Sequence, residues 1–454
     1  MPRIQRSDEP VSRQVSQPSR RIYYGWVIVL VGLVIMTLAA PLLASFSIFY
    51  VALLEDLKWS RSDTAMALSI FMIVTGLAGP FSGWLIDRYK PRWVMSAGML
   101  ITAAALLWLS QMESQWEFYV AFGVFASAGS ALIHIVPLTA IVSNWFMRHR
   151  GMALGLVTAG QGVGQACMPL LQYSIDHIGW RYTYLVIGAL LFVAPTTLII
   201  LFLERRPEDR GLTLADERLP WGGKREQISM SPSSAARTRE VVVMDRAWAE
   251  TEWTVANAAR TSRFWTLTIL MALFAVGFMM MVVQLAAYLT DKGYSAILAA
   301  SVIGLQGFIN IFGRFLGGAL SDHIGRERAL TLSVASSVTC LVLLHVAGMV
   351  VSPLLVYVFS IFYGVGSSMT LPVLMAAAGD IFQGKHLGAI IGVLMIGGFA
   401  GGALGAWMSG YLYDVTKAYE FMFVLAGLVM VASAALIWKA RPSQVRIIRT
   451  APAN

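Results

Sequence analysis

The 454-residue sequence has few charged residues and few cysteines. Only 13% of its residues are Asp, Glu, Lys or Arg, whereas an average soluble domain has about 25%. With 57% of residues apolar, the chain has more apolar surface than a water-soluble fold can bury. The two cysteines, Cys167 and Cys340, lack any CxxC or metal-ligand spacing, so we expect them to be packing residues. The composition therefore argues against a soluble protein.

The apolar residues are gathered in twelve runs of roughly the 20 residues that cross a bilayer. The runs lie at about 25–50, 63–86, 93–111, 117–143, 151–175, 182–203, 264–290, 297–320, 328–350, 354–379, 386–412 and 419–439. A backbone in lipid must satisfy its own hydrogen bonds, and these runs are too long and too uniformly apolar for barrel strands. We therefore predict an all-α integral membrane protein with twelve transmembrane helices.

Most Lys and Arg residues would lie on one side of such a bundle, which predicts that both termini are cytoplasmic. The chain then divides into a cytoplasmic tail (1–21), a six-helix bundle (22–203), a cytoplasmic linker (204–263), a second bundle (264–439) and a cytoplasmic tail (440–454). The net charge of +9 is expected to face anionic lipid headgroups, and no basic patch suggests nucleic acid. The first apolar run is too long to be the hydrophobic part of a signal peptide, so we expect it to stay in the mature protein as a span. We expect the protein to lie in a bacterial inner membrane.

An internal repeat relates the two bundles. Gly83 and Asp87 recur as Gly318 and Asp322, 235 positions later. Further pairs follow at displacements of 235 to 238 positions: Pro137 with Pro372, Gly151 with Gly388, Gly155 with Gly392, Gly160 with Gly397, Gly164 with Gly401, and Asp176 with Asp414. An even number of spans separates the copies, so the repeat predicts two parallel six-helix halves related by an axis along the membrane normal.

The repeated segment also carries a loop motif. Gly83, Asp87, Arg88 and Arg92 follow span two, and the second copy has Gly318, Asp322 and Arg326. In this motif the chain resembles the major facilitator superfamily, over nearly its whole length from Tyr23 to Lys439. The resemblance implies a latch of charges and helix ends that holds one face closed and breaks as the halves rock. Arg148 and Arg150, between spans four and five, are expected to belong to it.

Within that superfamily the chain resembles the monocarboxylate transporter and oxalate/formate antiporter branch. The resemblance rests on short fragments at the corresponding helices: Tyr23 to Trp26, Trp59 to Arg61, Trp145 to Gly151, and Tyr288 to Ser295. It implies transport of organic anions.

Arg314 is the main candidate for binding the anion. Of the 34 Lys and Arg residues, it alone lies well inside a span, and no acidic residue lies in the middle of any span to neutralise it. A guanidinium also offers a planar fork that suits a carboxylate. In the resembling branch, the arginine at this position is the substrate-anion site. Asn310 stands where animal members have an aspartate, and span eleven lacks the antiporter's lysine, which favours a monocarboxylate over a dianion.

Other polar residues in the spans are weaker candidates. His134 could bind substrate or carry a proton, or it could pack in the bundle against a backbone carbonyl. Gln284 and Tyr288 lie one turn apart and are expected to face the same side. Gln161, Gln165 and Ser45, with Ser47 and Tyr50, could line the site or join helices.

These features predict a secondary transporter of small carboxylates that works by alternating access, with proton symport or anion exchange. No Walker lysine follows the glycine-rich stretches, so neither ATP nor a cofactor is expected. The chain is expected to act as a monomer and to bind no metal. Two alternatives stay open: an efflux transporter for drug-like amphiphiles, and a non-transporting sensor of a carboxylate. An enzyme is not expected, because no nucleophile, base and orienting acid recur together.

Overall fold

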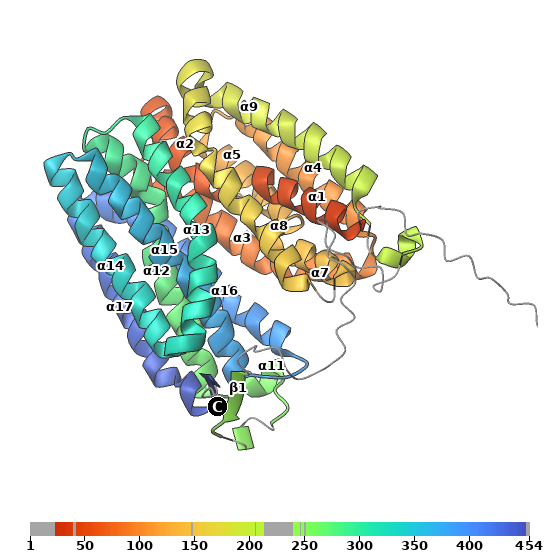
Figure 1. Cartoon of the computed structure of the whole chain (residues 1–454). Helices are drawn as coiled ribbons and strands as arrows, with labels where there is room; N and C mark the ends of the chain where they lie inside the picture. Colours follow the sequence, from red (N-terminus) through yellow and green to blue (C-terminus); the bar gives the residue numbers. More distant parts are fainter. Residues whose placement is uncertain are drawn as a thin grey trace, which may run out of the picture.

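The computed structural model describes residues 23–39, 42–146, 149–204, 206–212, 239–245, 247–248 and 251–450 (Figure 1). The predicted tail 1–21, half of the linker and residues 451–454 lie outside the described residues. The membrane part is all-α, as predicted, and the helices form an N-terminal half, coloured red to yellow, and a C-terminal half, coloured green to blue (Figure 1).

The N-terminal half runs from α1 to α9. Its elements are α1 (Gly25–Ala39), α2 (Leu42–Leu57), α3 (Arg61–Arg88), α4 (Pro91–Leu109), α5 (Gln115–Phe118), the π-helical segment η1 (Tyr119–Ala126), α6 (Ser127–Ala131), α7 (Ile135–Trp145), α8 (Arg150–Ala166) and α9 (Met168–Phe202). A short 3-10 turn, η2 (Pro207–Arg210), follows it.

The C-terminal half consists of long, uninterrupted helices. They are α12 (Ser262–Asp291), α13 (Ala296–Ile324), α14 (Arg326–Val350), α15 (Pro353–Ile381), α16 (Leu387–Thr416) and α17 (Glu420–Ala440). The remaining elements are the strand β1 (Arg239–Val243), the helix α11 (Val255–Ala259), the 3-10 turn η4 (Pro442–Gln444) and the strand β2 (Arg446–Thr450).

Ten helical stretches of the described chain are long and apolar enough to cross a membrane. One of them, Gly151–Phe202, holds two of the twelve predicted spans, because Gly179 adopts a φ of +78° and reverses the chain inside α9. The predicted span four is not among the ten, because it is broken before α7. Pro137 lies three residues into α7, and its ring excludes the helical hydrogen bond to the carbonyl of Ile133. The twelve spans are therefore present, with the fourth kinked.

Side-chain caps fix where several long helices begin. The hydroxyl of Ser60 accepts a hydrogen bond from the backbone N–H of Asp63 at the start of α3. Thr261 and Ser295 cap α12 and α13 in the same way, through the N–H of the residue three positions on. Such caps satisfy backbone donors that have no partner inside the helix. These three spans thus begin at a polar residue at the membrane edge.

The two halves meet mainly along two pairs of helices, α3 with α16 and α8 with α13, and α2 with α12 and α9 with α13 add further contacts. Along α3 and α16, the position that a Cβ would take at Gly410 lies 2.5 Å from the carbonyl oxygen of Arg61, and that at Gly76 lies 2.9 Å from the Cβ of Phe399. Small residues permit such close approach. Near the other end of this seam, no described atom of another helix lies within 4 Å of the Cβ position of Gly83.

Three further glycines of α3 and α16 likewise have no described atom of another helix within 4 Å of their Cβ positions: Gly79, Gly388 and Gly392. On α8 and α13, the Cβ position of Gly162 lies 2.6 Å from the carbonyl oxygen of Gly307, whereas Gly151 and Gly318 have no described neighbour within 4 Å. The halves are therefore closed together at one end of the bundle and separated at the other.

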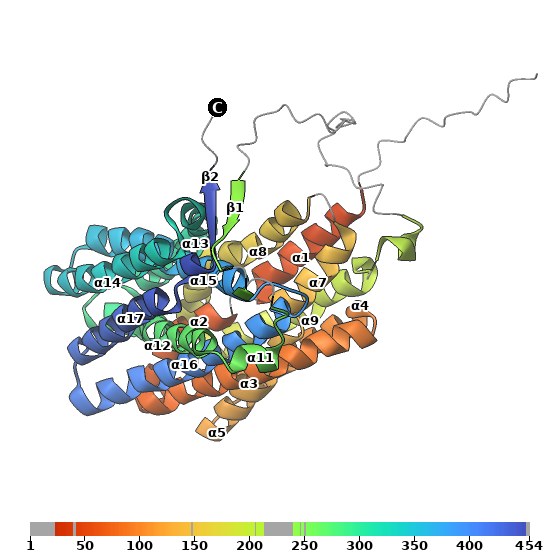
Figure 2. The same cartoon turned by 90° about the horizontal axis from the view of Figure 1, so that it is seen from below.

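The separated end carries the linker and the C-terminal strand, and we call it the linker face. Strand β1 of the linker pairs antiparallel with β2 of the tail, Val241 opposite Ile448 (Figure 2). Trp248 donates its indole N–H to the carbonyl of Ile381, 2.8 Å away, and Trp253 packs edge-on against Phe382. This end of the linker is thus attached to the C-terminal half. We call the closed end, where α2 leads into α3, the opposite face.

Candidate substrate site between the two halves

A cavity of about 320 Å³ lies between the two halves. The N-terminal half contributes α2, α3 and α8 to its wall, and the C-terminal half contributes α12, α13, α15 and α16. Most of the wall is apolar, with phenylalanine and methionine prominent: Met72, Met271, Phe274, Phe278, Met279, Met395 and Phe399. Polar side chains are confined to the parts of the wall made by α8, α13 and α15.

Arg314 of α13 lines this cavity, as do Asn310, Gln161 and Gln165 from the predicted set. Its Nη2 donates to the side-chain oxygen of Gln161 on α8, 3.0 Å away across the seam between the halves. Among the described residues, no carboxylate lies within ion-pair distance of this guanidinium. A cation in an apolar chamber with only an amide as partner is able to bind an anion.

His134 lies at the break in span four, as the residue that precedes α7. It is half-buried, and it is close enough to Arg314 for the charges of the two side chains to interact. It does not belong to the cavity wall itself. The structure therefore places the histidine behind the cavity, near its cation.

Three predicted residues lie away from the cavity. The hydroxyl of Ser45 donates to the carbonyl of Leu42 in its own helix, 3.0 Å away. The hydroxyl of Tyr288 donates to the carbonyl of Leu344, 3.1 Å away, inside the C-terminal half. Gln284, expected on the same side as Tyr288, turns instead toward the N-terminal half. One helical turn separates them along the chain, but their side chains point to different helices.

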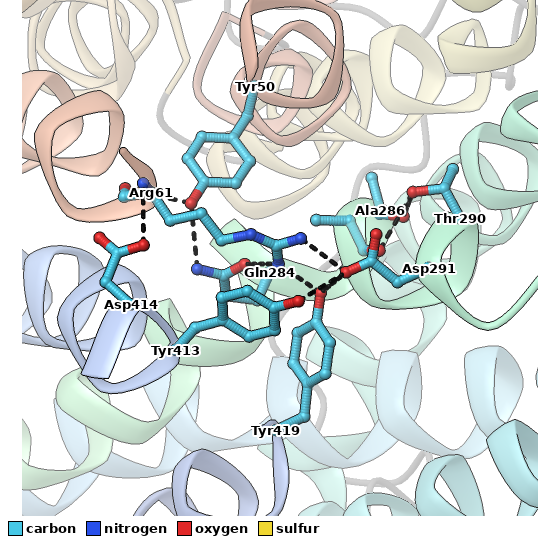
Figure 3. Close-up of polar contacts among 10 residues, drawn as sticks. Tyr50, Arg61, Gln284, Ala286, Thr290, Asp291, Tyr413, Asp414 and Tyr419 are labelled. Atoms are coloured by element: carbon cyan, nitrogen blue, oxygen red, sulfur yellow. Dashed lines mark hydrogen bonds and ion pairs between the residues drawn. The ribbon is translucent and has the colours of Figure 1, made fainter. Parts of the chain in front are cut away.

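Gln284 belongs to a polar network that joins the halves at the opposite face (Figure 3). At its centre, Arg61 of α3 forms an ion pair with Asp291 of α12, 2.6 Å between Nη2 and Oδ2. The same guanidinium donates to the side-chain oxygen of Gln284 at 3.3 Å and to the hydroxyl of Tyr419, and it lies 3.6 Å from the ring centroid of Tyr413. One cation from the N-terminal half thus contacts four side chains of the C-terminal half.

A carboxylate of the C-terminal half also binds the backbone at the start of α3. Asp414 of α16 accepts hydrogen bonds from the N–H groups of Arg61 and Ser62, at 3.2 and 2.7 Å. These donors have no partner within their own helix, and a carboxylate is favoured at the positive end of a helix dipole. Tyr50 completes the contact: its hydroxyl donates to the carbonyl of Arg61 and accepts from the amide of Gln284. The opposite face is therefore held by charges as well as by packing.

The loop motif lies at the linker face. In the second copy, Arg326 pairs with Asp322 at 2.6 Å and with Asp380 of α15 at 2.8 Å. In the first copy, Arg92 lies 4.0 Å from Glu204, and Arg88 lies over the ring of Trp84. Arg148 and the side chains of Asp87 and Arg150 lie outside the described residues. None of the contacts described for the motif joins the two halves.

The family model for the Major Facilitator Superfamily matches residues 27–371 and 346–452 of the chain. The chain belongs to the major facilitator superfamily. As a member of this superfamily it is a transporter and not an enzyme, and the twelve spans in two similar halves are the fold that the sequence predicts.

Among similar proteins, this superfamily member is 26% identical to monocarboxylate transporter 13 of Bos taurus over 415 residues, which cover 91% of this chain and 88% of the relative. It shares the fold of the crystal structure of a D-xylose-proton symporter, with a TM-score of 0.66 and 15% identity, over 93% of this chain and 99% of that one. It also matches the inward-facing, unoccupied structure of a bacterial homologue of the human lysosomal transporter Spinster, with a TM-score of 0.63 and 15% identity, over 93% and 96% of the two chains.

The network at the opposite face is the part of this transporter that sequence reasoning missed. Arg61 and Asp291 appear in the sequence only as members of two resembling fragments, and Asp414 only as the repeat of Asp176. The available signal was that all three are charged and stand at span ends on the side poorer in Lys and Arg. Charges placed at facing span ends are candidates for cross-half pairing, although the sequence does not say which of them meet.

Proposed function

We propose that the transporter moves small carboxylates of the monocarboxylate type by alternating access, driven by a gradient. The supporting observation is Arg314, which lines the cavity between the halves and has no carboxylate partner among the described residues. The bovine relative's name, monocarboxylate transporter, agrees with this chemistry. The absence of a second cation in the described cavity wall favours a singly charged substrate.

Charge compensation explains why such a carrier would close more readily with substrate than without it. Closing the linker face would bury Arg314 in a low-dielectric chamber, and an unpaired buried charge is costly. A bound carboxylate neutralises the guanidinium and lowers that cost. Closure of the linker face is then more favourable with bound substrate than without it. Substrate binding is thereby coupled to the change from the open to the closed linker face.

We propose further that the linker face is cytoplasmic and that this conformation is open to the cytoplasm. The excess of Lys and Arg at this face supports the orientation. The contact-free Gly83 and Gly318 and the within-half pairing of Arg326 support an open face. In the alternate state, the two copies of the loop motif would meet across the halves and act as the latch.

The coupling reaction is either proton symport or anion exchange, and His134 is our candidate for the proton. It lies near Arg314 and is the kind of side chain that gains or loses a proton near neutral pH. If the reaction is proton symport, a pH gradient should drive the wild type to accumulate the acid inside proteoliposomes. The His134→Gln variant should still exchange internal for external acid but should not accumulate it. If His134→Gln still accumulates acid as the wild type does, the histidine carries no coupled proton.

The experiment for the proposed function is uptake of labelled lactate and pyruvate into proteoliposomes. We expect Arg314→Ala to abolish uptake and Arg314→Lys to reduce it strongly, because a point charge does not replace a planar fork. Arg181→Lys is the matched control, because Arg181 bonds the carbonyl of Met112 far from the cavity. Unchanged flux and affinity in both Arg314 variants would reject the carboxylate site. Transport of lipophilic cations without competition by carboxylates would point to drug efflux instead.

A further inference from the structure

A second, smaller cavity of about 50 Å³ adjoins the first. Both cavities are lined by Gln165, Phe278, Val282 and Asn310, so the two spaces are contiguous. We call the smaller space the inner chamber. No charged residue lies in its described wall, which includes Ser47, Gln306 and Tyr363.

Four polar atoms of the inner chamber have no hydrogen-bond partner among the described residues: Ser47 Oγ, Gln306 Nε2, Asn310 Oδ1 and the hydroxyl of Tyr363. They make up half of the eight buried side-chain atoms of this kind in the described chain. Buried polar groups are nearly always paired, because an unpaired one loses its hydration without compensation. Four unpaired polar atoms around one small space are what we expect of a site that binds a polar group of a ligand.

The chemistry of the four atoms defines what that group can be. Two amides and two hydroxyls offer both donors and acceptors and carry no charge. A hydroxyl or a carboxamide, which also donates and accepts, satisfies such a set. A second carboxylate does not fit well, because no cation is present to compensate its desolvation.

The spacing along α13 separates this group from the carboxylate. Asn310 is four residues from Arg314, and Gln306 is eight residues from it on the same helix. At 1.5 Å per residue, the rise is about 6 Å to the first and about 12 Å to the second. Phe278 and Val282 of α12 line both spaces and provide an apolar wall along the way. A two- or three-carbon acid bound to Arg314 is too short to reach Gln306.

We propose that the inner chamber is a second recognition subsite, which binds a neutral hydroxyl or amide carried by the substrate at the end remote from its carboxylate. This inference rests on the proposed carboxylate site at Arg314. The preferred substrates are then carboxylates with an apolar body and a polar terminal group.

The test compares affinities of the purified full-length protein for hexanoate, 6-hydroxyhexanoate and adipate, measured by titration calorimetry. We expect 6-hydroxyhexanoate to bind roughly fivefold or more tightly than hexanoate, because its hydroxyl meets partners that hexanoate leaves unpaired. Adipate should bind more weakly than 6-hydroxyhexanoate, because its second charge enters a site without a cation. Comparing 4-hydroxybutyrate with 6-hydroxyhexanoate tests the spacing, and the shorter acid should gain less from its hydroxyl, because it can reach Asn310 but not Gln306.

Two variants assign the effect to the inner chamber. Ser47→Ala and Tyr363→Phe should each reduce the preference for 6-hydroxyhexanoate and leave the affinity for hexanoate unchanged. Ser45→Ala and Tyr288→Phe are the matched controls, because their hydroxyls bond backbone carbonyls away from both cavities. These controls should keep the wild-type preference.

The outcomes separate this inference from the function on which it rests. Equal binding of hexanoate and 6-hydroxyhexanoate, both lost in Arg314→Ala, would mean that the inner chamber holds only water; the second subsite would then be rejected and the carboxylate site kept. Loss of the preference in the control variants would also reject the assignment. If no acid binds at all, the carboxylate site fails and the second subsite fails with it.

Discussion

Arg61 and Asp291 form an ion pair, 2.6 Å between Nη2 and Oδ2, that joins the two halves of the transporter at the face opposite the linker. The arginine side chain is 13% exposed and the aspartate 38%. The pair is therefore partly shielded from water. The contacts of Arg61 with Gln284, Tyr413 and Tyr419 also hold the two halves together at this face. Opening this face requires all of these contacts to break.

Neutralising this pair should favour opening of the opposite face. We expect Arg61→Ala or Asp291→Asn to cost the closed arrangement about 1–2 kcal/mol, which changes the ratio of the two states roughly 5- to 30-fold. The measurement is the distance distribution between spin labels at the exposed positions 58 and 417, one on each half. Lys385→Ala is the control, because it removes an exposed ion pair with Glu252 that lies within the linker-face region. A distribution identical to that of the wild type would show that the ion pair does not hold the halves together.

Removing the carboxylate that caps α3 should act in the same direction. Asp414→Ala deprives the N–H groups of Arg61 and Ser62 of their acceptor, at a cost of about 0.5–2 kcal/mol. Its counterpart in the repeat, Asp176→Ala, should change the label distance less, because Asp176 accepts a bond from Gln172 of its own helix. Since Asp414 and Arg61 take part in one network, the double variant should cost less than the sum of the single ones. Equal effects of Asp414→Ala and Asp176→Ala would contradict the assigned role.

Enlarging the contact-free glycines at the linker face should trap the present state. We expect Gly83→Leu and Gly318→Leu to leave thermal stability nearly unchanged, because no described neighbour lies within 4 Å of either Cβ position. Transport should nevertheless slow, since the added side chains would block closure of this face. Gly162→Leu provides the contrast: its side chain would collide with Gly307 and Ile311 and lower stability. Full transport rates for Gly83→Leu and Gly318→Leu would argue against closure at these positions.

Acid should weaken the attachment of the linker to the C-terminal half. Lys385 donates to Glu252 at 3.1 Å, and this hydrogen bond and the lysine charge lower the pKa of Glu252. Because the folded value lies below the unfolded one, the pair stabilises the fold above the ordinary pKa of glutamate, about 4.3. This stabilisation is lost as the pH falls through the lowered value. The difference in thermal midpoint between the wild type and Lys385→Ala should therefore be small, present at pH 7 and absent near pH 3. A difference that grows on acidification would have the wrong sign.

The architecture could be predicted because the bilayer constrains the sequence strongly. Long apolar runs identify the spans, and the repeat of Gly83 and Asp87 identifies the halves. Arg314 could be singled out for the same reason, since a charged residue inside a span is costly and rare, and the structure places it in the cavity wall. Span four was predicted as one continuous helix, and the break that Pro137 causes in it was not predicted.

The side chains of the site were harder to predict, because helical phase does not determine which neighbour a residue meets. Gln284 and Tyr288 share a helix face by spacing, yet one contacts Tyr50 across the halves and the other Leu344 within its own half. The ion pair of Arg61 and Asp291 joins positions far apart in the chain. It depends on how the two bundles dock, which a single sequence does not encode in any local pattern.

Four methionines lie in the cavity wall: Met72, Met271, Met279 and Met395. Their unbranched, polarisable side chains can rearrange around bodies of different outline without losing van der Waals contact. A carrier with such a pliable lining gains little discrimination between straight, branched and ring-bearing bodies. If the cargo is bound as we propose, selectivity depends on charge at one end and on hydrogen bonding at the other, so chemically diverse compounds of similar polarity would compete for the same passage.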